Sequence, residues 1–218
     1  MLFGPPNIQF PDHPDIKVEE QEHFWMFYMG KSWLKWFPEA LSAEESHTML
    51  NAFLPSASSG WPWQEESIFL FGRWHKSPRL TLWYGERGYS YSGVWHPPAL
   101  FPEKVADLKE KAEKWAGTAF NSVLLNCYRN GKDSMGWHAD NEKVLGENPI
   151  IASLSLGATR QFHLKHRENP DLKMSFSLTS GSCLVMGGAL QQDWIHAIPK
   201  TQKPVGPRIN LTFRYVYG

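Results

Sequence analysis

The chain contains little of several features that mark particular classes of protein. Its 218 residues include two cysteines, Cys127 and Cys183, which form neither a disulfide framework nor the CxxC spacing of a zinc site. No apolar run approaches the roughly 18 residues of a membrane-spanning helix, and the first residues lack the pattern of a signal peptide. We therefore expect an intracellular protein with two buried free thiols and no membrane contact, cytoplasmic if bacterial and nuclear if eukaryotic.

An excess of charge of one sign is also missing, because 22 lysines and arginines balance 22 aspartates and glutamates. The acids gather near the start: residues 1–60 hold eight acids and three lysines, which leaves 19 (22 − 3) basic and 14 (22 − 8) acidic residues elsewhere. This local excess of positive charge permits a phosphate-binding face without requiring one. Nothing in the sequence indicates oligomerisation, so a monomer is expected.

The first part of the chain predicts an appendage to the core. Residues 1–30 are rich in proline, acids and aromatics and show no clear period, so we expect residues 1–60 to form an extended arm and a helix that pack on the body. Ser42-Ala43-Glu44-Glu45 is a capping box, which predicts a helix that ends before Pro55. A second helix is expected after Pro102, where apolar residues recur at helical spacing.

From residue 119 the pattern changes to short apolar segments bounded by Gly, Pro, Asn or Asp, which is typical of strands. The predicted strands are 122–127, 150–156, 161–165, 173–178, 181–186 and 210–215. Many short antiparallel strands with two flanking helices predict a mainly β fold, a sandwich or a jelly roll, over residues 61–218.

One short motif carries potential metal ligands. Trp137-His138-Ala139-Asp140 places His138 and Asp140 on alternate residues, which share a face in an extended segment. His196, 58 positions later (196 − 138), offers a third ligand from the strand region. Two imidazoles and a carboxylate form the facial triad of non-haem Fe(II) oxygenases, which leaves metal positions open for cosubstrate and O₂. The alternative is that these are ordinary surface or core residues, since the chain has nine histidines.

A segment near the C-terminus alternates polar and apolar side chains. Its polar set is Arg208, Asn210, Thr212 and Arg214. A strand that points two arginines into a jelly-roll interior needs anions to neutralise them. A dicarboxylic keto acid meets that need, because guanidinium groups bind carboxylates through two hydrogen bonds. The spacing fits equally well with a surface strand whose arginines are solvated.

Taken together, these motifs resemble the AlkB family of alkylation-repair dioxygenases over roughly residues 65–218. The similarity to the animal DNA-repair members is closest in residues 121–130, 149–160 and 208–214. The motifs that carry the resemblance, in family order, are Asn126-x-Tyr128, His138-x-Asp140, His196 and Arg208-x-Asn210-x-x-x-Arg214.

The resemblance implies a double-stranded β-helix with Fe(II) as cofactor and 2-oxoglutarate and O₂ as cosubstrates. It implies that His138, Asp140 and His196 hold the iron. The expected reaction removes methyl groups from bases of the 1-methyladenine and 3-methylcytosine type in DNA. Oxidation of the methyl carbon releases formaldehyde while 2-oxoglutarate loses CO₂ to become succinate.

The resemblance also implies a cosubstrate site. Arg208, with Asn126 and Tyr128, would bind the far carboxylate of 2-oxoglutarate. Arg214, helped by Asn210, would approach the carboxylate that chelates the metal, which makes Arg214 a candidate catalytic residue.

The target base must be flipped out of the stack to be reached. The segment Tyr89-Ser90-Tyr91-Ser92-Gly93 resembles the family segment that supplies an aromatic lid, so we expect Tyr91 to stack on the base, with the ring of His138 opposite. Glu142 would favour a cationic methylated base, although Asn141 stands where close animal members often have a second Asp. The alternatives are that Tyr91 is a packed core aromatic and that Glu142 is merely solvated or paired with Lys143.

A second hairpin is expected in the nucleotide-recognition region, about residues 65–95. By resemblance to the duplex-preferring animal member, Phe71 is the wedge that fills the gap left by the flipped base. Arg73, Lys76 and Arg79 are then candidate phosphate contacts. The alternative is a hydrophobic hairpin buried under the arm. Residues 78–86 resemble a member that prefers single strands, so both strand forms, RNA as substrate, and a non-catalytic nucleic-acid-binding module stay open.

Overall fold

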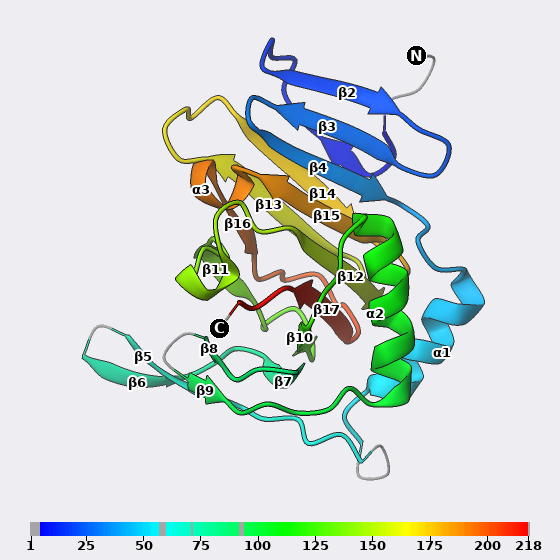
Figure 1. Ribbon diagram of the computed structural model, residues 1–218, viewed down its shortest axis with the longest axis vertical. Coiled ribbons are helices and arrows are strands. Elements are labelled where there is room, and N and C mark those ends of the chain that lie inside the picture. Colours follow the sequence, from blue (N-terminus) through cyan, green and yellow to red (C-terminus); the bar gives the residue numbers. More distant parts are fainter. Residues whose placement is uncertain (1–4, 57–59, 71, 92–93, 218) are drawn as a thin grey trace.

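The computed structural model describes residues 5–56, 60–70, 72–91 and 94–217, with the backbone alone at 68–70, 89–91 and 94. Within these residues the chain forms two main antiparallel sheets that pack face to face. The outer face of the larger sheet is covered by α1 (Ala43–Phe53) and α2 (Glu103–Ala116) (Figure 1). The fold is mainly β, as predicted, and the two sheets have the arrangement of a jelly roll.

The larger sheet has eight strands in the described part of the chain. Their order is β2 (Ile16–Glu20), β3 (Trp25–Met29), β4 (Ser32–Phe37), β15 (Cys183–Gly188), β12 (Ile151–Gly157), β17 (Arg208–Arg214), β10 (Ser122–Tyr128) and β7 (Leu80–Gly85). Its centre, β12, β17 and β10, joins strands that are far apart in the sequence.

Among the described residues, the smaller sheet has five strands. Their order is β1 (Ile8–Gln9), β14 (Lys173–Leu178), β13 (Arg160–His166), β16 (Trp194–Ile198) and β11 (Met135–His138). Outside the two sheets lie the hairpins β5 (Ser67–Leu70)–β6 (Arg73–Lys76) and β8 (Tyr89–Tyr91)–β9 (Val94–His96), and the short helices η1 (Lys143–Leu145) and α3 (Leu190–Asp193).

Two apolar layers hold these elements together. One lies between the sheets and includes Phe27, Trp36 and Phe176, and the other lies between the larger sheet and the helices and includes Phe53 and Phe213. Strands β10 and β17 lie between both layers and are therefore buried along their whole length. A polar side chain on either strand must find its partner inside the protein.

The six strands and two helices that the sequence predicts are confirmed, with ends that shift by one or two residues. The cap of α1 is also confirmed, since the Ser42 hydroxyl accepts a hydrogen bond from the Glu45 amide at 3.1 Å.

The N-terminal region contains strands that the sequence did not predict. Within the part expected as an extended arm and helix, β2, β3 and β4 form a meander that continues the larger sheet, because β4 pairs with β15 along its length. The sequence conceals these strands, since residues 25–29 are Trp-Met-Phe-Tyr-Met and show no alternation of polar and apolar types, although their burial does alternate.

We expect Ser42→Ala to lower the free energy of unfolding by about 1 kcal/mol, because the Glu45 amide at the start of α1 would lose its acceptor. Urea unfolding followed by circular dichroism measures this. Ser42→Thr, which keeps a hydroxyl that can accept this hydrogen bond, is the matched control, and an equal loss in both variants would contradict the cap.

Candidate metal centre and cosubstrate pocket

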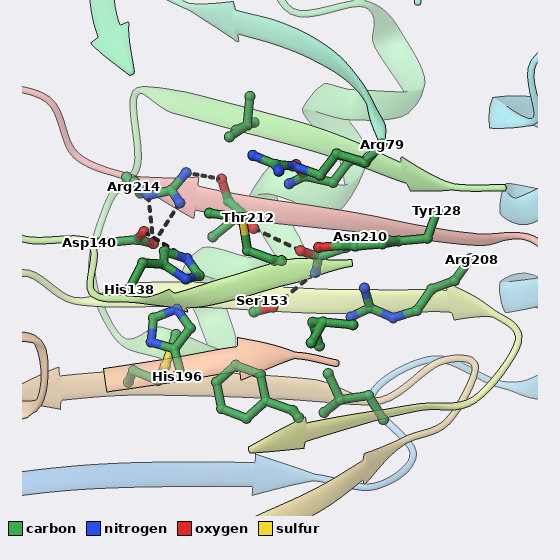
Figure 2. Close-up of a pocket in the computed structure, with 17 residues that line it drawn as sticks. Arg79, Tyr128, His138, Asp140, Ser153, His196, Arg208, Asn210, Thr212 and Arg214 are labelled. Atoms are coloured by element: carbon green, nitrogen blue, oxygen red, sulfur yellow. Dashed lines mark hydrogen bonds and ion pairs between the residues drawn. The ribbon is translucent and has the colours of Figure 1, made fainter. Parts of the chain in front are cut away.

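The three predicted metal ligands come together at one end of the smaller sheet (Figure 2). His138 ends β11 and lies opposite His196 on the paired strand β16, with ring centroids 4.2 Å apart. Asp140 follows two residues after His138, and its Oδ1 lies 3.7 Å from His138 Nε2. One potential ligand atom from each of the three residues lies within 4.8 Å of the others, so the group can hold one metal ion.

Neighbouring groups fix the orientation of these ligands. His138 Nδ1 lies 2.8 Å from the carbonyl oxygen of Gly136, which can only accept, so Nδ1 carries the proton and Nε2 presents its lone pair towards Asp140. Asp140 Oδ2 accepts from Arg214 Nη2 at 2.6 Å and from Nε at 3.2 Å. Asp140 Oδ1 is buried and has no hydrogen-bond partner among the described residues. The Asp140 amide donates to Gln191 Oε1 at 3.0 Å.

The electrostatics of the site favour metal-binding protonation states. Burial lowers the pKa of His138. Burial, together with the repulsion that a protonated His138 would exert, lowers the pKa of His196 to about 3. Burial alone would raise the pKa of Asp140, but the positive charge of Arg214 outweighs it and holds the pKa well below its usual range. The site therefore offers two neutral imidazoles and one carboxylate with an unpartnered oxygen, the donor set that Fe(II) takes in a facial triad.

The strand β17 settles which way the two arginines point. Arg208, Asn210, Thr212 and Arg214 are all buried and line a pocket between the sheets that also contains the metal ligands (Figure 2). The intervening apolar residues face the helices. The alternative of a surface strand with solvated arginines is therefore wrong.

Arg208 lies at the inner end of this pocket as a buried cation, 1% exposed. Its Nη2 donates to Ser155 Oγ at 2.9 Å, and its guanidinium carbon lies 5.2 Å from the Tyr128 ring centroid. Nε and Nη1 have no hydrogen-bond partner in the described part of the chain. Burial lowers the pKa of Arg208 to about 10. A buried guanidinium with unused donors fits an incoming carboxylate, which would supply both charge and acceptors.

Comparisons with known proteins agree with this geometry. The model of the 2OG-Fe(II) oxygenase superfamily matches residues 34–214. Human alpha-ketoglutarate-dependent dioxygenase alkB homolog 3 is 43% identical over 171 residues, which is 72% of this chain and 58% of that protein. Its mouse counterpart is 34% identical over 228 residues, 99% of this chain and 78% of that protein. The chain belongs to the AlkB family of this superfamily.

One further sequence relative and one solved structure are also similar to this chain. The Arabidopsis thaliana DNA oxidative demethylase ALKBH2 is 37% identical over 184 residues, 71% of this chain and 58% of that protein. The solved structure of OsALKBH1 superposes with a TM-score of 0.58 at 16% identity, over 83% of this chain and 97% of that one, and supports the fold. The chain thus spans little more than half the length of several relatives that it matches. In the described residues, no helix is long and apolar enough to cross a membrane.

The remaining predicted cosubstrate residues of this AlkB-family chain also line the pocket. Asn126 and Tyr128 reach it from β10, the neighbour of β17. Asn210 Nδ2 donates to Ser153 Oγ and to the Leu154 carbonyl, each at 2.9 Å. The amide of Asn210 is thereby held in one orientation within the pocket.

Arg79 lies elsewhere than predicted. It is 5% exposed, lines the pocket, and donates from Nε to Asn126 Oδ1 at 2.7 Å, so its position argues against a phosphate contact on the surface. The cause is the pairing of β7 with β10, which the local sequence does not reveal and which places Thr81 opposite Asn126. The sequence also gives no signal for Gln191, whose contact with Asp140 spans 51 residues.

The predicted nucleic-acid contacts lie around the hairpins. Arg73 and Lys76 are exposed on β6, and Lys76 Nζ forms an ion pair with Glu65 at 2.7 Å. Glu142, half-buried, precedes η1 just after the metal motif. Tyr91 ends β8, but its side chain is outside what the structure describes, and Phe71 lies wholly outside the described residues. The roles predicted for these five residues stay predictions.

Proposed function

We propose that this AlkB-family protein is an oxidative demethylase of N-alkylated bases in DNA, of the 1-methyladenine and 3-methylcytosine type. The observation that carries the proposal is the pocket in which a His-Asp-His triad lies beside Arg208, a buried cation with unused donors. The names of the relatives, an alpha-ketoglutarate-dependent dioxygenase and a DNA oxidative demethylase, agree with this chemistry.

In the proposed reaction, His138, Asp140 and His196 would hold Fe(II), which would activate O₂, the oxidant, for attack on a methyl C–H bond. Gly136 and Gln191 keep two of these ligands in place through the His138 ring and the Asp140 amide. Because the ligands are already oriented, the protein needs little rearrangement when the metal binds.

The other polar residues that line this pocket would hold 2-oxoglutarate. Arg208 receives the far carboxylate of 2-oxoglutarate, beside Tyr128 and Asn126, and its buried charge is neutralised on binding. Arg214 neutralises Asp140 and would also attract the second carboxylate of 2-oxoglutarate, while Asn210 lines the same pocket beyond Thr212 on the same strand. One oxygen atom of O₂ would enter succinate as 2-oxoglutarate loses CO₂, and the other would enter the methyl group. The resulting N-hydroxymethyl group would break down to formaldehyde and the unmodified base.

The substrate enters from the side of the hairpins β5–β6 and β8–β9. Tyr91 stacks on the flipped base, Glu142 stabilises its positive charge, and Phe71 fills the gap in the duplex. Arg73 and Lys76 contact phosphates, for which Lys76 exchanges its ion pair with Glu65. A methyl group on the pairing edge lowers the cost of flipping, because it already prevents normal pairing.

The test uses purified protein with Fe(II), ascorbate and 2-oxoglutarate on oligonucleotides that carry 1-methyladenine or 3-methylcytosine. Mass spectrometry follows methyl loss on single-stranded DNA, duplex DNA and matched RNA. We expect methyl loss that requires 2-oxoglutarate and is faster on DNA. Faster loss on RNA would reassign the substrate, and an absence of methyl loss with all cofactors present would reject the proposal.

A further inference from the structure

A second hollow lies on the outer face of the smaller sheet, opposite the face that carries the metal ligands. It is a groove of about 510 Å³ that crosses β11, β13 and β14 and is bounded by Phe10 after β1. Its lining includes Trp137, His163, Lys165 and Lys173. The residues assigned to iron, 2-oxoglutarate and the target base lie elsewhere, so the reaction proposed above leaves this groove unexplained.

The groove has an aromatic ring and a cation in contact. Trp137 is 46% exposed, although burial of its indole would be favourable. Lys165 Nζ lies 4.3 Å from the centroid of the Trp137 ring, and the His163 ring lies 6.4 Å from it on the same face of the sheet. An exposed flat ring beside a lysine offers stacking to a flat group and charge to an anion in one place.

The positive charge of the groove favours a negatively charged ligand. Lys165 and Lys173 both line it, and none of the described residues that line it is acidic. A ligand that combines planar rings with regularly spaced negative charge is a single strand of nucleic acid. On β6, by contrast, the exposed Lys76 is compensated by Glu65.

The groove and the active site share one wall. Trp137 directly precedes the metal ligand His138 on β11, and Trp137 lines the groove whereas His138 lines the pocket. β11 is the last strand of the smaller sheet in the described chain, so a polymer that leaves the pocket can pass around this edge without crossing another strand. We propose that the groove binds the single strand that carries the target base, a few nucleotides away from that base. This inference rests on the proposed function.

The experiment measures binding of a fluorescein-labelled, unmethylated DNA strand of about 15 nucleotides by anisotropy at several salt concentrations. Lys165→Gln/Lys173→Gln should weaken binding about tenfold at low salt and reduce the slope of log affinity against log salt by about 1.4, at about 0.7 per lost phosphate contact. Trp137→Ala should weaken binding about tenfold, while Trp137→Phe, which keeps a ring, should retain most of the affinity.

A matched control lies on the far edge of the larger sheet. There Lys17 Nζ lies 5.9 Å from the ring centroid of Tyr28, which is 40% exposed. Lys17→Gln/Tyr28→Ala removes a similar pair from β2 and β3 and should bind the strand like the unmodified protein.

Three results would overturn the proposal: wild-type affinity in the double lysine variant, an equal loss in the control, or no binding by the unmodified protein. A fourth is a dimer in size-exclusion chromatography that the lysine variant dissolves, because the groove would then join two copies of this chain. The probe carries no methyl group and the assay needs no turnover. The binding result can therefore be interpreted even if the protein does not demethylate DNA.

Discussion

Replacing Asp140 with Ala should abolish turnover and also destabilise the protein by about 3–5 kcal/mol, since it would deprive the buried Arg214 of its carboxylate. The ion pair is short, 2.6 Å, and both side chains are almost fully buried, so solvent cannot replace the lost charge. His196→Ala should abolish turnover as well. Its free energy of unfolding should change much less, because a neutral imidazole leaves no charge behind.

Urea unfolding of the metal-free variants, together with titration of each with Mn(II) as a redox-stable probe, separates the two effects. Asp140→Ala/Arg214→Met provides the matched control. It removes both charges, so it should recover much of the lost stability while metal binding and turnover stay absent. Retained activity in His196→Ala would remove that residue from the triad. Equal stability of Asp140→Ala and His196→Ala would show that the Arg214 ion pair contributes little.

Replacing Arg208 with Met should have opposite effects on cosubstrate binding and on the stability of the ligand-free protein. Loss of a buried charge-assisted contact costs about 2–5 kcal/mol, which predicts a KM for 2-oxoglutarate that rises about 30-fold or more. The ligand-free protein should be as stable as before or more stable, because the guanidinium is buried and two of its nitrogens have no hydrogen-bond partner among the described residues.

Thermal unfolding with and without 2-oxoglutarate, and steady-state kinetics over a range of its concentrations, measure both effects. Arg208→Lys is the comparison variant, because an ammonium keeps the charge but not the paired donors. Its KM for 2-oxoglutarate should lie between those of the unmodified protein and Arg208→Met. An unchanged KM in Arg208→Met would place the far carboxylate elsewhere in the pocket. A large loss of stability without ligand would show that Arg208 supports the fold through Ser155 and Tyr128.

The sequence predicted those features of the protein that depend on residues close together in the chain. The alternation in residues 208–214 matches a strand with one polar face, and the cap at Ser42 depends on residues within one helical turn. His138 and Asp140 could be paired because an extended segment repeats every two residues. The third ligand, His196, was named from its chemistry and not from a geometric signal.

Features that depend on distant pairing could not be derived in this way. Arg79 appeared to belong to an exposed hairpin, yet the pairing of β7 with β10 places it against Asn126, 47 residues away. Gln191 reaches the Asp140 amide from a short helix that has no motif around it. Both contacts depend on how strands pair across the sheets, and pairing is decided by the whole core.

The pairing of β4 with β15 has a consequence for how the chain folds during synthesis. Residues 32–37 pair with residues 183–188, so β4 cannot pair with β15 until nearly the whole chain has been synthesised. At about 5–20 residues per second, the ribosome needs about 7–30 s to cover that interval. During this time the hairpin of β3 and β4 exposes Trp25, Leu34 and Trp36 and an unpaired strand edge. The nascent chain is therefore most prone to aggregation in its N-terminal third, far from the residues that perform the chemistry.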